Sequence, residues 1–344
     1  MRIALIGLPQ AGKKTLFQLL TGRAIPPGRK SEEAIEGTAS IRDPRVDALS
    51  AICRPQRKVY AENRFVLCPD VDARTTGRAW LDAARKCDLV CLVLRAFASE
   101  SVYHPAGSVD PQRDRADLET ELILADMEIA ETRLARLEKE RGSRKPAPER
   151  ELEELTLRRA CGALQDGRRL ADVAFEPHEL AAIQHLGMLT LLPLLCTYNV
   201  AESGLSASFG PGAFAVSAQI EAEIAAIDDA RERQDYLAAI GLAASGVDRM
   251  NAAAYAALGL MSFYTIGEDE VRAWTVRRGA PAPVAAGKIH SDLQRGFIRV
   301  EIIKFADLVE AGSERGARES GRLRVRGKDY LMEDGDICHF LFNV

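Results

Sequence analysis

The sequence predicts an α/β protein built on a mostly parallel β-sheet, and three observations support this class. Apolar runs of strand length recur between the N-terminus and residue 218, a glycine-rich loop directly follows the first of them, and amphipathic segments separate the others. Runs that are apolar throughout are typical of strands whose two faces are both buried under helices. The predicted class is therefore a doubly wound sheet with helices on both faces.

Composition places the chain among ordinary globular proteins. Its 344 residues are 47% hydrophobic and 28% charged, and the formal net charge is −4. No apolar run approaches the ~20 residues of a membrane-spanning helix, and the N-terminus lacks a signal-peptide pattern, so we expect a cytoplasmic protein without membrane contact. Seven scattered cysteines without a CxxC pair indicate reduced thiols. The net charge argues against a protein that coats nucleic acid through bulk charge.

The predicted elements begin with strand, loop and helix. RIALI (2–6) is the first buried strand, and the helix after the glycine-rich loop carries Leu16, Leu19 and Leu20 at helical spacing and ends at Gly22. The sheet domain is expected to comprise residues 1–116 and 188–262. Its further buried strands are RFVLC (64–68), DLVCLVL (88–94), LTLLPLLCTYN (189–199) and AFAVSA (213–218).

A charged segment interrupts this domain at residues 117–187. Apolar side chains recur close to a heptad spacing up to residue 141, and the pattern resumes after the break GSRKPAP. The segment is therefore predicted to be an inserted helical coiled-coil hairpin whose charged flank is solvated. Its apolar positions are Leu118, Leu122, Ala125, Ile129, Leu134, Leu137, Leu152, Leu155, Ala160 and Leu164.

Residues 263–344 are predicted to form a small α+β domain, because short β-rich runs broken by Gly, Pro and Asp surround the helical ADLVEAG. The run RGARESGRLRVRGK is interpreted as a strand with alternate basic residues on one face. That face either meets RNA phosphates or is a charged edge that discourages strand pairing. The basic residues are Arg315, Arg318, Arg322, Arg324, Arg326 and Lys328.

The stretch GLPQAGKKTLF (7–17) has the spacing of a phosphate-binding loop, in which two glycines let backbone N–H groups surround a phosphate and a lysine bridges the β- and γ-phosphates. Its position between a buried strand and a helix favours a P-loop nucleotide site. The alternative is a tight glycine turn with an exposed lysine. The candidate ligands are Gly7, Gln10, Ala11, Gly12, Lys13, Lys14 and Thr15.

Two further segments are candidates for contact with the base. Asn199, Val200, Ala201 and Glu202 follow a buried strand where a guanine-binding protein would carry NKxD, and give NxxE instead. Ser217 and Ala218 follow the next strand and fit the turn that contacts the base in such proteins.

The whole chain resembles the YchF family, the Obg-like ATPases, which are P-loop proteins of the translation-factor class. The motifs are GLPxxGKxTLF, RDPRVDALSAICRPQRKV, the NVAE loop and EVRAWTVRRGAPAPVAAGKIHSDLQRGFIRVEII through GKDYLMEDGDICHFLFNV. The resemblance implies a P-loop domain, an inserted coiled-coil domain and a C-terminal TGS-like β-grasp domain. It also implies binding of ATP in preference to GTP, through Asn199 and Glu202, and association with ribosomes or RNA.

Several positions depart from the family pattern. Lys14 replaces the serine that ligates Mg²⁺, so the sequence leaves Mg²⁺ binding open and predicts no metal ligand. Leu67 stands where the family has the aspartate of DxxG; either Asp70 or Asp72 compensates, or the loop is rebuilt and does not switch. Ser31 is the nearest candidate for the switch threonine that senses the γ-phosphate. These departures predict weak or lost hydrolysis.

His104 is the candidate catalytic residue. The resemblance implies that it positions water, and the alternative is a solvated or packing residue. The other histidines are interpreted as structural. Two functions are thus open: a nucleotide-binding protein with ATP or GTP as ligand and slow turnover, or a non-catalytic interaction protein with a degenerate nucleotide site.

Overall fold

The computed structural model describes residues 1–26, 33–72, 78–141, 148–210 and 212–343, so Ser31 lies outside the described residues. The chain divides into two compact units, one made of Met1–Thr38 and Arg64–Met250 and the other of Ala39–Asn63 and Asn251–Val344. Among the described residues, none of the helices is long and apolar enough to span a membrane. The division into three domains stays a prediction.

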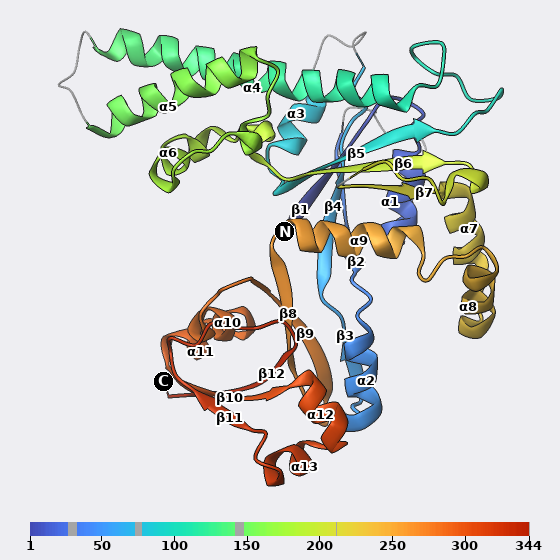
Figure 1. Cartoon of the computed structure of the whole chain (residues 1–344), viewed down its shortest axis with the longest axis vertical. Coiled ribbons are helices and arrows are strands. Elements are labelled where there is room, and N and C mark those ends of the chain that lie inside the picture. Colours follow the sequence, from blue (N-terminus) through green and yellow to red (C-terminus); the bar gives the residue numbers. More distant parts are fainter. Residues whose placement is uncertain (27–32, 73–77, 142–147, 211, 344) are drawn as a thin grey trace. The chain divides into compact units, whose positions relative to one another are not determined.

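Each unit is organised around one β-sheet (Figure 1). The strands are β1 (Arg2–Ile6), β2 (Ile35–Ser40), β3 (Arg57–Val59), β4 (Glu62–Leu67), β5 (Leu89–Ala96), β6 (Leu194–Val200), β7 (Ala213–Val216), β8 (Leu260–Thr265), β9 (Glu270–Arg277), β10 (Phe297–Lys304), β11 (Arg324–Arg326) and β12 (Asp336–Phe342). The α-helices are α1 (Lys13–Thr21), α2 (Pro44–Cys53), α3 (Ala79–Ala84), α4 (Pro111–Arg141), α5 (Pro148–Gln165), α6 (Pro177–Ile183), α7 (Ala218–Ala226), α8 (Ala230–Ala239), α9 (Gly246–Ala257), α10 (Ala282–Ile289), α11 (Ser291–Arg295), α12 (Phe305–Ala311) and α13 (Glu314–Glu319). Short 3₁₀ turns are η1 (Leu170–Asp172), η2 (Gln184–Leu186), η3 (Leu189–Leu191) and η4 (Glu202–Gly204).

The first sheet has the strand order β2-β4-β1-β5-β6-β7, and β1 pairs in parallel with both β4 and β5. The β5–β6 and β6–β7 pairs are parallel as well. The predicted α/β class is confirmed, because the five apolar runs fall on the adjacent strands β4, β1, β5, β6 and β7. The run 189–199 is only partly a strand, since its first residues form η3 and β6 begins at Leu194. The first helix ends at Gly22, which has φ 64°, a left-handed conformation that favours glycine.

One face of this sheet is covered by α3 and the first half of α4. Ala4 and Ile6 of β1 share a core cluster with Trp80 of α3 and with Leu118 and Leu122 of α4. Beyond that point α4 packs on α5, where Ala130 and Leu137 meet Leu157, Ala160 and Leu164. The predicted hairpin is therefore an extension of a helix that begins on the sheet. Leu155, which we expected in its apolar seam, is 66% exposed, and Leu157 takes that place.

A buried carboxylate fixes the return from the hairpin to the sheet. Asp126 of α4 accepts hydrogen bonds from the backbone N–H of Leu189 (2.8 Å) and from both the N–H and the hydroxyl of Thr190 (2.7 and 2.6 Å). Burial raises the pKa of Asp126, and the hydrogen bonds oppose that rise. The segment before β6 is thus held against α4.

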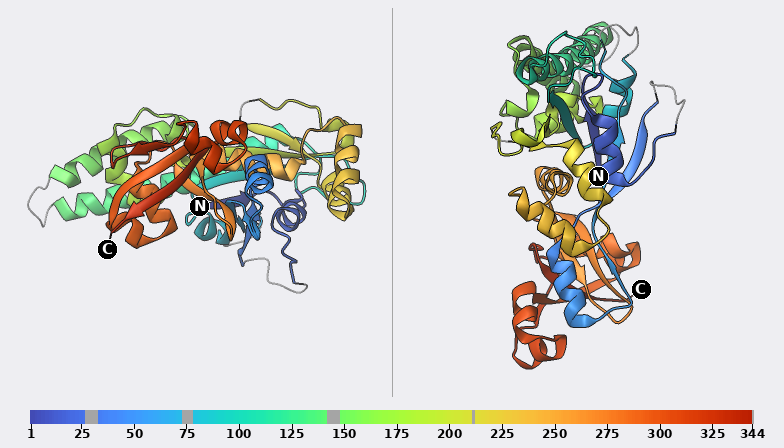
Figure 2. Two further views of the ribbon diagram at one scale, coloured as in Figure 1. Left: turned by 90° about the horizontal axis from the view of Figure 1, so that it is seen from below. Right: turned by 90° about the vertical axis from the view of Figure 1, so that its right-hand side faces the viewer.

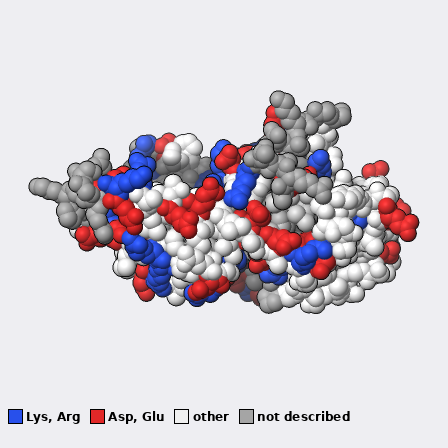
Figure 3. Space-filling model, turned by 90° about the horizontal axis from the view of Figure 1, so that it is seen from above, with Lys and Arg blue, Asp and Glu red and all other residues white. Residues whose placement is uncertain are grey.

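The flank of the hairpin carries both signs of charge. Figure 3 shows Lys and Arg interspersed with Asp and Glu on the face that includes the hairpin. Ion pairs join α4 to α5, as between Arg133 and Glu153 (2.7 Å) and between Arg158 and Glu138 (2.9 Å). Such a mixed surface agrees with a solvated flank.

The second unit is a mixed sheet of order β11-β10-β12-β8-β9-β3. Helices α10 and α11 cover one face, where Ala282, Ala285 and Ala286 pack with Phe297 and Val300. Residues 39–63 contribute α2 and β3, and β3 pairs in parallel with β9. Figures 1 and 2 show this early segment, drawn in blue, beside the orange strands of the unit. The small α+β fold expected for the C-terminal region is present.

The basic run of this unit is only partly a strand. Arg315 and Arg318 lie on α13, and β11 comprises only Arg324–Arg326. Arg315 pairs with Glu319, and Arg318 pairs with Glu301. The expectation of one alternating strand was wrong, because Ser313 caps a helix by accepting the N–H of Gly316.

Asp43, the N-cap of α2, anchors the early segment in the second unit. Its carboxylate accepts hydrogen bonds from the backbone and guanidinium of Arg45 and from the hydroxyl of Tyr264 on β8. Arg45 also pairs with Asp334 (2.9 Å). Burial alone would raise the pKa of Asp43, but the hydrogen bonds from Arg45 and Tyr264 outweigh it and hold the pKa below its usual value.

We expect Asp43→Asn to lower the free energy of unfolding by about 2 kcal/mol at neutral pH, because it weakens the hydrogen bonds that Asp43 accepts from the partly buried Arg45 and from the buried hydroxyl of Tyr264. The loss should shrink in acid, because a carboxylate with a lowered folded pKa stabilises the fold only while it is ionised. Urea titrations at several pH values measure both effects. Asp47→Asn on the same helix, where Asp47 makes an exposed pair with Lys58, is the control and should cost less than about 1 kcal/mol. Equal losses for the two variants would contradict the assignment.

Candidate nucleotide-binding site

The glycine loop joins β1 to α1, and both of its signature glycines are required by close approach. A Cβ added to Gly7 would lie 2.4 Å from the carbonyl oxygen of Val93, and one added to Gly12 would lie 2.2 Å from Asn199 Nδ2. Gly12 also has φ 95°, in the left-handed region. As the N-cap of α1, Gly12 offers no side chain to the first-turn N–H groups, which suits an anion at this helix end.

Lys13 is buried beneath this loop, with 3% of its surface exposed. Its ammonium donates to the carbonyl oxygens of Gly7 (2.7 Å) and Leu8 (2.8 Å) and contacts Asp70 Oδ1 at 2.5 Å. Burial lowers the pKa of Lys13, and the Asp70 carboxylate opposes that shift. The alternative of a tight turn with an exposed lysine does not describe this loop.

Asn199, at the end of β6, connects the glycine loop to the turn after β7. Its Nδ2 donates to the carbonyl oxygen of Ala11 (3.1 Å), and its Oδ1 accepts the N–H of Ala218 (3.0 Å). Ser217 is buried and caps α7 by accepting the N–H of Ile220. The structure thus brings together three of the predicted segments around the Asn199 amide.

The remaining predicted ligands differ in exposure. Val200 is buried, whereas Glu202 is exposed at the start of η4. Gln10, Lys14 and Thr15 are exposed at the loop and the first turn of α1. Gln10 has φ 62°, which is uncommon for a residue with a side chain.

The residues present do not fit the usual Mg²⁺ site of a P-loop. An ammonium at Lys14 cannot coordinate a cation, and Leu67 is 3% exposed in the sheet core, paired with Leu5. Of the two candidate acids after β4, Asp70 is engaged by Lys13, and Asp72 is half-buried in the same loop. Within the described ranges, no group of three or more His, Cys, Asp or Glu side chains could hold a metal ion.

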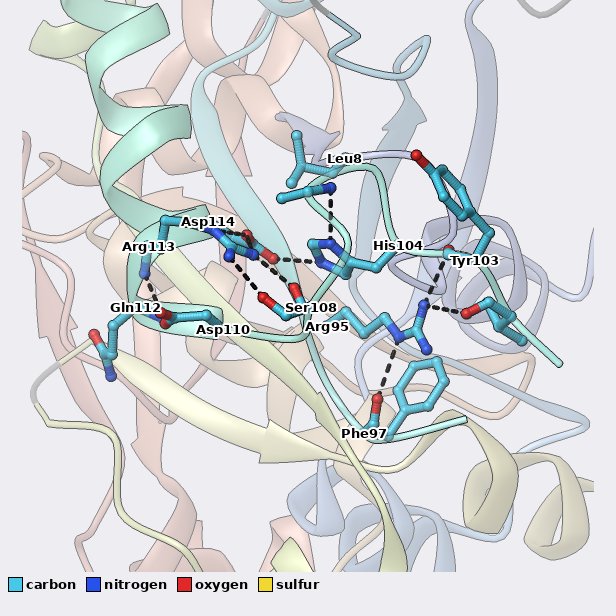
Figure 4. A network of polar contacts seen from close by, with 12 residues as sticks. Leu8, Arg95, Phe97, Tyr103, His104, Ser108, Asp110, Gln112, Arg113 and Asp114 are labelled. Atoms are coloured by element: carbon cyan, nitrogen blue, oxygen red, sulfur yellow. Dashed lines mark hydrogen bonds and ion pairs between the residues drawn. The ribbon is translucent and has the colours of Figure 1, made fainter. Parts of the chain in front are cut away.

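His104 lies in the loop between β5 and α4 and is 6% exposed. Its Nδ1 accepts the backbone N–H of Ala106 (3.2 Å), and its Nε2 lies 2.8 Å from Asp114 Oδ2 in the first turn of α4 (Figure 4). Arg113 donates to the other carboxylate oxygen of Asp114. Both ring nitrogens therefore have partners within the chain, and a role in positioning water stays a prediction.

Comparison with known proteins decides the family. A family model described as YchF-GTPase_C, protein of unknown function (DUF933), matches residues 260–343. The ribosome-binding ATPase YchF of Haemophilus influenzae is 36% identical over 364 residues, covering 100% of this chain and 99% of that protein. The chain belongs to the YchF family. Its Bacillus subtilis relative of the same name is 34% identical, over 99% of this chain and 98% of the relative. The solved structure of the Schizosaccharomyces pombe YchF GTPase matches with a TM-score of 0.86 and 27% identity, covering 99% and 97% of the two chains.

Sequence reasoning missed a buried arginine that shapes the His104 loop of this YchF protein. Arg95, near the end of β5, is 2% exposed and donates to the carbonyl oxygens of Phe97 (3.2 Å), Val102 (3.0 Å) and Tyr103 (3.1 Å) (Figure 4). Burial lowers its pKa, and the charge of Asp114 opposes that shift. A charged residue directly after the run DLVCLVL was the available signal.

A cavity of about 740 Å³ lies between α3 and α4, separate from the predicted nucleotide ligands of this YchF chain. Its lining includes Arg85, Glu128 and Arg133. Arg133 is already paired with Glu153, so this cavity does not present a row of free cations.

We expect Asn199→Ala to lower the free energy of unfolding by about 2 kcal/mol, because it leaves a buried N–H and a buried carbonyl without their partner. Amide exchange at Ala218 should accelerate. Asn199→Asp should keep Ala218 protected, because it retains the acceptor, while an oxygen now faces the carbonyl of Ala11. Exchange measured by NMR or mass spectrometry separates the two variants, and fast exchange at Ala218 in both would contradict this geometry.

His104 should be found as the Nε2–H tautomer, because a backbone N–H can only donate and so Nδ1 must accept. Long-range ¹H–¹⁵N NMR of the imidazole nitrogens reports the tautomer directly. The exposed ring of His178 serves as the reference for an imidazole in contact with solvent. A proton found on Nδ1 of His104 would contradict the assignment.

Proposed function

We propose that this chain is a nucleotide-binding protein that takes an adenine nucleotide at the glycine loop, prefers ATP to GTP, and associates with the ribosome. The observation that carries the proposal is the buried Lys13 under a loop that Asn199 ties to the Ala218 turn, in a chain 36% identical over its full length to a ribosome-binding ATPase YchF. A lysine and a set of inward-facing amides at a helix N-terminus suit phosphate groups.

The base preference rests on the family resemblance through NxxE. Since both polar groups of the Asn199 side chain are already engaged, its part is to align the loops that flank the base. Glu202 is exposed two residues after β6 and has an acceptor to offer the base. Ser217 and Ala218 lie at the end of the next strand, where the N–H of Ala218 already donates to Asn199, so their proposed part is to hold the turn beside the base.

Turnover is expected to be slow or absent, because hydrolysis in P-loop proteins depends on positioned water and neutralised charge. Leu67 is buried where the family has an acid, and Lys14 stands at the position of the metal ligand. His104 would need to exchange a partner before it could hold water. Phosphate neutralisation therefore falls to Lys13, with Lys14 and the α1 amides beside it.

Ribosome association is proposed for the second unit. Among its basic residues, Arg322 pairs with Glu310, whereas Arg324, Arg326 and Lys328 are exposed on and after the short edge strand β11. Exposed arginines and lysines on one edge suit phosphate contacts, which weaken as salt rises. Cosedimentation with ribosomes, compared between wild type and Arg324→Glu, tests this part.

Calorimetric titration of nucleotide-free protein with ATP and with GTP, each with and without Mg²⁺, tests nucleotide binding. We expect ATP to bind more tightly than GTP and without dependence on Mg²⁺, since the loop lacks the metal's hydroxyl ligand. Lys13→Ala should weaken binding by about tenfold to a hundredfold, because it removes the positive charge under the loop and the bonds that hold the carbonyls of Gly7 and Leu8. Lys14→Ser should restore dependence on Mg²⁺.

The control is Lys86→Ala, which removes an exposed lysine outside the loop and should leave affinity unchanged. Binding of neither nucleotide would contradict the proposal and favour the alternative, a non-catalytic interaction protein with a degenerate nucleotide site. Tighter binding of GTP would contradict the base preference alone.

A further inference from the structure

The ammonium of Lys13 has three N–H donors, and all three find acceptors within the chain. Two point at the carbonyl oxygens of Gly7 and Leu8, at 2.7 and 2.8 Å, and the third faces Asp70 Oδ1 at 2.5 Å. In a phosphate-binding loop this lysine reaches the β- and γ-phosphates of the nucleotide. Asp70 thus offers Lys13 an anionic oxygen of the kind that a phosphate would offer.

Backbone hydrogen bonds before and after Asp70 in the sequence hold the residue in this position. The N–H of Cys68 donates to the carbonyl oxygen of Leu5 (3.2 Å), which continues the pairing of β4 with β1. The N–H of Val71 donates to the carbonyl oxygen of Gly7 (3.2 Å), the same oxygen that Lys13 contacts. The backbone at Asp70 is therefore tied to the glycine loop itself.

The position and the charge of Asp70 bear on how many phosphates the site can accept. Asp70 stands three residues after Leu67 and therefore occupies the position of the glycine in the family's DxxG motif. Its side chain is 34% exposed, so the carboxylate borders the solvent-accessible side of the loop, while Lys13 is buried behind it. A third phosphate brought to Lys13 would meet a fixed like charge, and the loop lacks the hydroxyl that would place a cation between them.

We infer that this site selects nucleoside diphosphates over triphosphates, with the Asp70 carboxylate in the place of the terminal phosphate. The inference rests on the proposed function, because it assumes that the glycine loop binds a nucleotide. It deepens that function by naming the ligand class: the base preference is for adenine, and the preferred phosphate chain is the shorter one. Asp70 acts as a specificity-determining residue, not a catalytic one.

The test is calorimetric titration of the full chain with ADP and with ATP, in Mg²⁺ and in EDTA. Wild type should bind ADP at least about tenfold more tightly than ATP, because the repulsion between the Asp70 carboxylate and a third phosphate a few ångström away is large enough for this ratio near a protein surface. Asp70→Asn keeps an oxygen for Lys13 but removes the charge, and should bring ATP to within about threefold of ADP. Asp82→Asn, an exposed position on α3 with the same change of net charge, should keep the wild-type ratio.

Three results would overturn the inference, and they are distinguishable. Equal affinity of wild type for ADP and ATP, with binding still lost in Lys13→Ala, rejects the role of Asp70 and leaves the proposed function intact. Weaker ATP binding in Asp70→Asn only when Mg²⁺ is present identifies Asp70 as a metal ligand instead. Binding of neither nucleotide rejects the inference together with the proposed function. Thermal unfolding of each variant checks folding, and Asp70→Gly gives a second variant without the charge.

Discussion

The candidate site depends on the burial of one ammonium group beneath the glycine loop. A buried lysine is costly unless its donors and its charge are satisfied, and Lys13 meets both needs with two carbonyl oxygens and one carboxylate. Because the carbonyls belong to Gly7 and Leu8, the lysine also fixes the path of the loop that surrounds it. Along that path the backbone at Gly7 and at Gly12 comes so close to neighbouring atoms that neither position has room for a side chain.

The loops around this centre are held by single polar side chains at the ends of central strands. Asn199 at the end of β6 bonds to both the glycine loop and the turn before α7. Arg95 near the end of β5 donates hydrogen bonds to carbonyl oxygens of the segment that leads to His104. Parallel strands end at one edge of the sheet, so side chains far apart in the sequence meet there. In this arrangement one side chain, Asn199, joins the glycine loop to the turn before α7. The polar groups of Asn199 and Arg95 are engaged in hydrogen bonds within the chain.

Outside the site, two segments do not follow the domain boundaries that their position in the sequence suggests. Helix α4 contributes Leu118 and Leu122 to the sheet core before it becomes part of the hairpin, so the hairpin is continuous with the domain that carries the site. Residues 39–63, which run from the end of β2 to the start of β4, belong to the second unit, where Asp43 and Arg45 bond to Tyr264 and Asp334. Strand β3 of this segment is thereby part of the second sheet, whereas β2, the first strand after the glycine-loop helix, belongs to the first sheet.

The sequence by itself determined the elements whose signals are local. Uninterrupted apolar runs gave β1, β5 and β6, Gly22 ended the first helix, and the spacing of Gly7, Gly12 and Lys13 identified the loop, because periodicity and glycine geometry act over a few residues. The tertiary structure alone decided which side chains interact: Asp70 with Lys13, Asp114 with His104, and Asn199 with the backbone of two loops. It also placed Arg315 on a helix. Those contacts depend on where strand ends and loops meet in space and on which polar groups become buried there, and neither is written in the local pattern of residues.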